Sequence, residues 1–194
     1  MPDTGAPWNI PYVAGTDLVA DWPTDSQTLA EAIADGLDAA GGLKQVVQST
    51  LTSTFTASVA QGGISGAALA VTITPTSATS KVLIIGSLNI AAQAQDLFFG
   101  ATLYRGGSAL FQGDAAGSRQ QVTATGWGMD ATASNVSIIY LDSPATTSAT
   151  TYDVRLSHGA AATRNVRMNR AHSDGDANTT ARGASSLIAI EVAG

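Results

Sequence analysis

From Leu43 to the end of the chain, apolar and polar residues alternate in short runs that are separated by turn residues. Val47, Leu51 and Phe55 fall on one face of an extended chain, while Gln48, Thr50, Thr52, Thr54 and Thr56 fall on the other. A period of two predicts a strand that is buried on one side. The pattern predicts one strand that runs from about residue 47 to residue 56.

Similar patterns recur along the rest of the chain, with no helical pattern between them. They predict strands at 69–73, 82–85, 97–104, 108–111, 121–125, 135–141, 151–157, 165–169 and 186–192. Residues 82–85 are all apolar, which is typical of a strand buried on both faces. Gly106 and Gly107 predict a hairpin between two of these strands. The spacing of the strands indicates an antiparallel sandwich or barrel.

Residues 25–40 have a helical pattern in place of the alternation. Leu29, Ile33 and Leu37 stand four apart and form one apolar stripe. Thr24 with Gln27 and Thr28 with Glu31 match capping boxes, and two glycines at 41–42 predict the end of the helix. So short a helix is marginal alone, so it needs a partner, either its copies in a bundle or the domain that follows.

Residues 1–24 hold four of the six prolines and two of the three tryptophans. Proline fixes φ and removes a backbone donor, so we expect an extended leader. A loose tail is the plain alternative, although disordered tails are poor in aromatic residues. The apolar side of the leader predicts an anchor on another protein, made by Trp8, Ile10, Pro11, Tyr12 and Trp22. We therefore expect a leader at 1–24, a neck helix at 25–42 and a β head at 43–194.

The composition narrows the possible partners. Only 12% of the residues are charged and the net charge is −6, which argues against a nucleic acid as partner. The chain has no cysteine, so disulfides and thiolate metal sites are excluded. No apolar run reaches the length of a membrane span, and the first residues do not resemble a secretory signal. The weakly charged surface suits extensive contacts between subunits.

Few residues suggest chemistry, so we expect no enzyme, no cofactor and no metal. His158 and His172 fall in predicted loops, where we expect them to be solvated. No G-x-S-x-G motif precedes a helix. The alternating oxygens at residues 174–178 fit either a calcium loop or a surface turn, and the glycine is misplaced for an EF-hand.

Four arginines stand close together in an otherwise weakly charged chain: Arg164, Arg167, Arg170 and Arg182. Guanidinium groups bind carboxylates and phosphates with two parallel hydrogen bonds. These residues are therefore a candidate clamp for acidic glycans or lipopolysaccharide phosphates. Equally, they could pair with Asp174 and Asp176 or cross a subunit boundary.

The leader at 8–12 and 21–23, followed by the helix start at 29–33, resembles the N-terminal segment of small tail-fibre and minor structural proteins of tailed bacteriophages. Residues 74–84 and 185–192 are similar to their C-terminal heads. The resemblance covers nearly the full length, but its motifs are short. It implies a jelly-roll head like that of tumour necrosis factor, a homotrimer and a function in assembly and adsorption, and it carries over no catalytic residue.

The sequence thus predicts a virion component made in the host cytoplasm: a trimeric tail fibre or knob that binds a host cell-surface glycan or protein. The alternative is a capsid decoration, cement or head-fibre protein that stabilises the shell. A glycan-active enzyme on the same fold would need a pocket with two close carboxylates.

Overall fold

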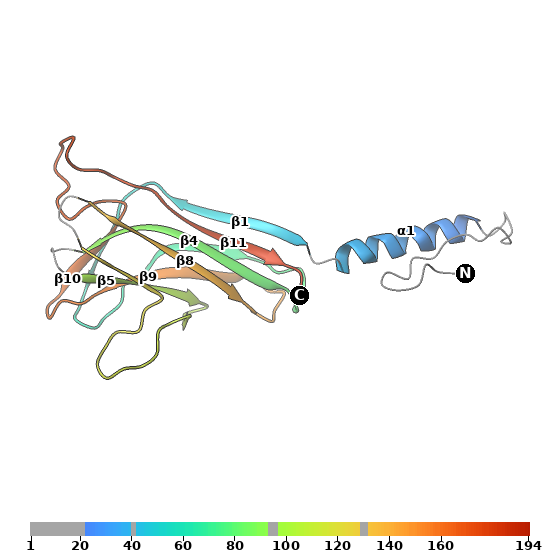
Figure 1. Cartoon of the computed structure of the whole chain (residues 1–194), viewed down its shortest axis with the longest axis horizontal. Helices are drawn as coiled ribbons and strands as arrows, with labels where there is room; N and C mark the ends of the chain where they lie inside the picture. Colours follow the sequence, from blue (N-terminus) through green and yellow to red (C-terminus); the bar gives the residue numbers. More distant parts are fainter. Residues whose placement is uncertain (1–21, 40–41, 93–96, 129–131) are drawn as a thin grey trace.

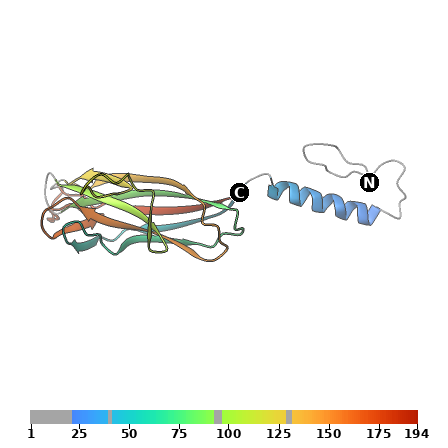
Figure 2. The same ribbon diagram turned by 90° about the horizontal axis from the view of Figure 1, so that it is seen from below.

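The computed structural model describes residues 22–39, 42–92, 97–128 and 132–194. These residues form one helix, α1 (Trp22–Ala39), and a sandwich of two antiparallel sheets. Figures 1 and 2 show α1 beyond one end of the sandwich, without a sheet to pack against. The prediction of a mainly β chain, with one short helix followed by an antiparallel sandwich, is confirmed.

The first sheet has six strands in the order β1, β11, β4, β10, β2, and β8 pairs with β4. Their bounds are β1 (Leu43–Leu51), β2 (Phe55–Val59), β4 (Lys81–Ala92), β8 (Ser134–Asp142), β10 (Arg164–Met168) and β11 (Ser185–Val192). The second sheet has the order β3, β9, β5, β6, and β7 pairs with β5. Its bounds are β3 (Ala67–Ile73), β5 (Phe98–Arg105), β6 (Ser108–Leu110), β7 (Ala124–Trp127) and β9 (Thr150–His158).

The core lies between the two sheets and is filled by every second residue of the strands. Ile84 and Leu88 of the first sheet and Phe99, Leu103 and Tyr152 of the second have no exposed surface. Burying each such side chain stabilises the fold by roughly 1.5–3 kcal/mol. Where the sequence alternates, as at Val136 and Ile138 of β8, the apolar positions are the ones that point inward.

The predicted strand at 47–56 is in fact two strands, β1 and β2, with a break at residues 52–54. β10 and β11 follow one another along the same edge of β4, and β2 and β1 lie beside them. The side chain of Asn169, between β10 and β11, donates hydrogen bonds to the carbonyls of Leu51 and Ser53. These bonds take the place of strand pairing at the break.

The continuous apolar run at 82–85 predicts burial on both faces, and that prediction is only half right. Val82 and Ile84 face the core and are fully buried. Leu83 and Ile85 face outward from β4 and are only half-buried. The described residues put no second layer on this side of the sheet.

Two further predictions need correction. The strand predicted at 121–125 lies at Ala124–Trp127 and pairs with β5. At Thr123 the amide still donates to the Ala101 carbonyl, but the side-chain hydroxyl, in place of a main-chain carbonyl, accepts from the Leu103 amide, so regular pairing starts only at Ala124. The helix begins at Trp22, three residues before its predicted start. Thr24 is therefore inside the first turns, and Thr28 Oγ1 donates to the Thr24 carbonyl and not to a capping position.

Candidate interaction surfaces

The outer face of the six-stranded sheet carries a band of aliphatic side chains. Strand pairing aligns two rows across β1, β11, β4 and β8: Val46, Ile190, Leu83 and Leu141, followed by Gln48, Ile188, Ile85 and Ile139. Directly paired residues have Cβ atoms about 5 Å apart, so the seven aliphatic residues are continuous. We call these seven residues the aliphatic face.

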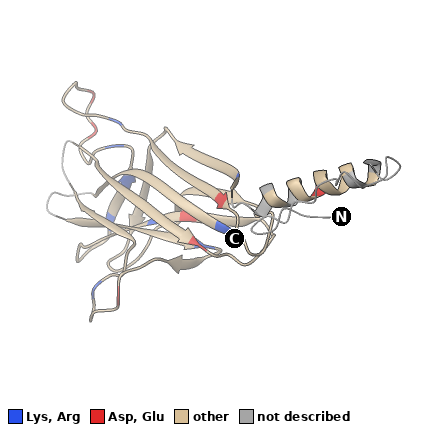
Figure 3. Ribbon diagram, turned by 45° about the vertical axis from the view of Figure 1, so that its right-hand side comes forward, with Lys and Arg blue, Asp and Glu red and all other residues tan. Residues whose placement is uncertain are grey.

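The aliphatic face is open to solvent. Ile139 is 66% exposed, Val46 59% and Leu141 49%. Neither row contains a charged residue, and the next row toward Ser185 is made of hydroxyl side chains: Thr50, Ser186, Ser87 and Ser137. Figure 3 shows how few charged positions the sandwich has. Contiguous exposed apolar surface of this kind marks an interaction site in a soluble protein.

Sequence reasoning did not identify Val46, Ile139 or Leu141 as candidate surface residues. Each has the correct alternation for a strand, but alternation alone does not reveal that both faces of β8 and β1 are rich in apolar residues. The available sign was the pair Ile138 and Ile139, where two adjacent isoleucines must point to opposite faces.

The predicted neck helix presents part of its stripe to solvent. Ile33 is 44% exposed and Leu29 is half-buried, while the side chain of Leu37 lies outside the described residues. The backbone of Trp22 belongs to the first turn of α1. The other predicted anchor residues, Trp8, Ile10, Pro11 and Tyr12, lie outside the described residues, so the anchor stays a prediction.

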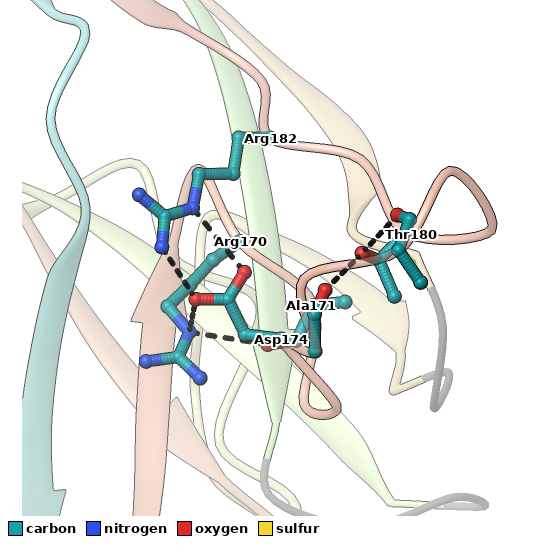
Figure 4. A network of polar contacts seen from close by, with 7 residues as sticks. Arg170, Ala171, Asp174, Thr180 and Arg182 are labelled. Atoms are coloured by element: carbon teal, nitrogen blue, oxygen red, sulfur yellow. Dashed lines mark hydrogen bonds and ion pairs between the residues drawn. The ribbon is translucent and has the colours of Figure 1, made fainter.

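Two of the four candidate arginines, Arg170 and Arg182, pair with one carboxylate, that of Asp174 (Figure 4). Arg182 Nη2 lies 2.8 Å from Asp174 Oδ2, and Arg170 Nε lies 3.4 Å from the same oxygen. The hydrogen bond from Arg182 is the main cause that lowers the pKa of Asp174. Arg164 stands at the other end of β10, opposite Val59, and is exposed.

Arg167 differs from the other arginines because it is buried, with 7% of its surface exposed. Its Nε and Nη1 atoms have no hydrogen-bond partner. Burial, and then the charge of Arg170, lower the pKa of its guanidinium, while Asp174 partly opposes them. Val166 and Met168 point into the core, so Arg167 lies on the outward face, as its strand position predicts.

The segment at 174–178 is built as a polar turn. Both carboxylate oxygens of Asp174 bind guanidinium nitrogens. Thr180 Oγ1 bonds the carbonyls of Gly175 and Ala177, which are the main-chain oxygens of the same segment. Asp174, the first candidate calcium ligand, is thus occupied by arginines. Across the four described ranges, no group of three or more metal-binding side chains comes together.

The two histidines differ from each other. The prediction that His158 is solvated is wrong, because β9 extends to this residue and its side chain is fully buried. Its Nδ1 accepts a bond of 3.1 Å from the Ala160 amide, and its Nε2 lies 2.8 Å from the Val59 carbonyl. His172 is in a loop and half-buried. His158 therefore serves to join β9 to β2.

Neither a protein-family model nor a curated protein matches the sequence. Solved structures with some likeness come from infectious bursal disease virus. The Gx strain structure is 16% identical with a TM-score of 0.40, covering 78% of this chain and 41% of that chain. The VP2 subviral particle is 12% identical, with a TM-score of 0.37 and coverage of 78% and 41%. The T=1 particles are 14% identical, with a TM-score of 0.37 and coverage of 78% and 39%.

The chain thus spans about two fifths of the length of these proteins. Identities and TM-scores of this size carry no argument about what the chain does. Within the described residues, no helix has the length and apolar character needed to cross a membrane.

Proposed function

We propose that the chain is a structural protein of a virus particle, a homotrimeric fibre or knob of a tailed bacteriophage. In this proposal residues 1–24 attach to another virion protein, the neck helices and heads associate with their copies, and the far end of the head binds a host cell-surface glycan or protein. The observation that carries the proposal is the uncovered aliphatic face, because it points to permanent association.

The size of the sheet suits such an association. Four strands side by side and nine residues long measure roughly 20 Å by 30 Å. Each partner in a stable interface buries about 800 Å². The outer face of the sheet, of which the aliphatic face is part, has an area of the same order. The absence of charge from both rows fits a partner surface that is equally apolar. A copy of the same chain supplies such a surface.

The neck helix also supports a copy of the same chain as the partner. α1 is followed, after three residues, by Leu43 at the start of β1, and Leu43 is 67% exposed beside the aliphatic face. A second copy has its apolar stripe and its aliphatic face in the same order. One symmetric assembly therefore covers Ile33 and Ile139 in every subunit at once.

The pairing of β1 with β11 defines which end of the head lies near the neck and which end lies far from it. Leu43 lies opposite Val192 at the end nearest α1, and Leu51 lies opposite Ser185 at the other end. The loop that holds Arg170, Asp174 and Arg182 precedes Ser185, so it faces away from the neck (Figure 1). A surface that meets the host while the leader is held in the particle belongs at this end.

Light scattering on the purified full chain tests the assembly. We expect a particle of three times the chain mass of 19.6 kDa. Replacing both Ile139 and Leu141 with Asp should give monomers, because two charges would be buried without a partner in each interface. Ala70→Asp is the matched control, since Ala70 is an exposed strand position on the opposite sheet. A monodisperse wild-type monomer would refute the homotrimer.

An antibody against the head, applied to intact particles, tests the location. Signal at the tip of the tail supports the fibre or knob. Signal spread over the head of the particle replaces it with the alternative, a decoration, cement or head-fibre protein that uses the same leader and the same aliphatic face.

A further inference from the structure

A polar hollow of about 240 Å³ lies on the outer face of the five-stranded sheet. Its floor comes from Thr102 of β5 and Ser157 of β9, which point outward because Ala101, Leu103 and Leu156 point into the core. The turn at 62–64 and the loop between β6 and β7, which contributes Gln120, also line the hollow. Sequence reasoning did not identify any of these residues.

Three residues that line this hollow each have a buried side-chain oxygen without a hydrogen-bond partner: Thr102 Oγ1, Ser157 Oγ and Gln120 Oε1. Thr102 is 1% exposed and Ser157 is 3% exposed. Buried polar atoms are nearly always satisfied, and leaving one unsatisfied is unfavourable. Three such atoms from three separate segments in one hollow indicate that a further polar group completes the set.

The required chemistry can be read from the three atoms. Gln120 Nε2 donates to the His158 carbonyl at 2.9 Å. This bond fixes the orientation of the amide, so that Oε1 points away from that carbonyl. An amide oxygen only accepts, so the missing group must donate a hydrogen. The hydroxyls of Thr102 and Ser157 can donate or accept. A group that carries several hydroxyls satisfies all three atoms.

The lining offers an ionic ligand no opposite charge, which favours a neutral one. No residue that lines the hollow is charged. Arg155, whose guanidinium lies over the ring of Tyr104 at 4.1 Å from its centroid, is already paired with Asp153 at 2.7 Å. Tyr104 also lines the hollow, so carbon atoms of its side chain are within reach of C–H groups of a ligand. Hydroxyls beside C–H groups are the surface of a sugar.

We infer that this hollow binds one unit of a neutral sugar, with Thr102, Ser157 and Gln120 as the hydrogen-bonding residues. The inference deepens the proposed function, on which it rests for the source of the sugar, by naming the class of host-surface ligand. It assigns that ligand to the second sheet and not to the arginine cluster.

Titration calorimetry of the full chain tests the site, with glucose, galactose, mannose and N-acetylglucosamine as probes and sialic acid as the charged comparator. We expect at least one neutral sugar to bind and sialic acid not to bind. Thr102→Val and Ser157→Ala should each lower the affinity tenfold or more. Thr72→Val is the matched control, because Thr72 is an outward-facing threonine of the same sheet bonded to Thr151 and outside the hollow.

Thermal unfolding of the same variants separates binding from structure. Removing an unpartnered buried hydroxyl should leave the head as stable as the wild type or more stable, so lost binding cannot be explained by unfolding. The inference fails if no neutral sugar binds, if sialic acid binds instead, or if both variants bind as well as the wild type.

The light-scattering mass of the wild type keeps the two proposals apart. An intact trimer that binds no neutral sugar overturns the sugar site alone. A monomer that binds a sugar overturns the assembly and leaves the site.

Discussion

Asn169 donates its side-chain amide to the main-chain carbonyl of Leu51 at a distance of 2.6 Å. The same amide bonds the Ser53 carbonyl at 2.9 Å, and its oxygen accepts from Ser185 Oγ at 2.6 Å. Asn169 has no exposed surface and a φ of 62°, a conformation that asparagine tolerates better than most residues. One residue thus ties the break between β1 and β2 to the start of β11.

We predict that Asn169→Ala destabilises the head by about 3 kcal/mol, because three hydrogen bonds are lost, one of them to the buried Ser185, and alanine is strained at positive φ. Denaturant unfolding measures the change. Asn135→Ala is the control, since Asn135 is exposed and makes one bond of 3.1 Å to Ser87. A loss below 1 kcal/mol for Asn169→Ala would show that strand pairing alone holds this junction.

The stability of the head should fall in acid because of Glu191. Burial alone would raise the pKa of this carboxyl, but hydrogen bonds from Gln45, Thr76 and Ser80 outweigh it and lower the pKa to about 2 from 4.5. A lowered folded-state pKa gives stability that is complete above about pH 4.5 and is lost as the pH falls toward 2.

Glu191→Gln tests this dependence. We expect a loss of about 2 kcal/mol at pH 7, since charge-assisted bonds become neutral ones, and a smaller further loss between pH 4.5 and pH 2 than in the wild type. Denaturant unfolding across this pH range is the measurement, with Glu31→Gln on the exposed side of α1 as the control. If the free energy of unfolding falls equally with pH in Glu191→Gln and the wild type, other carboxyls cause the loss of stability in acid.

Arg167→Met should make the head more stable, by about 1 kcal/mol. A buried guanidinium with two unpartnered nitrogens is unfavourable, and a methionine fills similar space without them. Arg164→Met, at an exposed position on the same strand, should change stability by less than about 0.5 kcal/mol.

The same variant tests Arg167 as a ligand residue. If Arg167 also clamps an acidic ligand, Arg167→Met will lower adsorption to host cells while raising the unfolding temperature. Unchanged adsorption would remove Arg167 from the candidate ligand residues.

The anchor hypothesis predicts that Trp8→Ala abolishes incorporation into particles and leaves the unfolding temperature of the head unchanged. An aromatic side chain that docks on a partner carries much of the binding energy. Trp127→Ala is the control, because Trp127 is 62% exposed on the head itself. Quantitative blotting of purified particles measures incorporation. Normal incorporation of Trp8→Ala would mean that the leader is not held through this residue.

Strand prediction succeeded where one face of a strand is buried, as at Val136, Ile138 and Tyr140 of β8. It failed at residues 52–54, because the break depends on Asn169, more than a hundred residues away. It also failed at His158, where a loop histidine became a buried bridge between strands. For the arginine cluster, the sequence suggested a ligand clamp or a pairing with aspartates, and the structure supplies the pairing with Asp174.

An all-β head behind a short helix can be predicted from the amino-acid pattern, because period-two alternation and turn residues are local properties of the chain. Which outward-facing residues meet depends on how the strands pair. Strand register brings Val46, Ile190, Leu83 and Leu141 into one row, and it gathers Thr102, Ser157 and Gln120 around one hollow. Both surfaces join segments distant in sequence, and pairing between such segments depends on the whole fold and not on any local pattern.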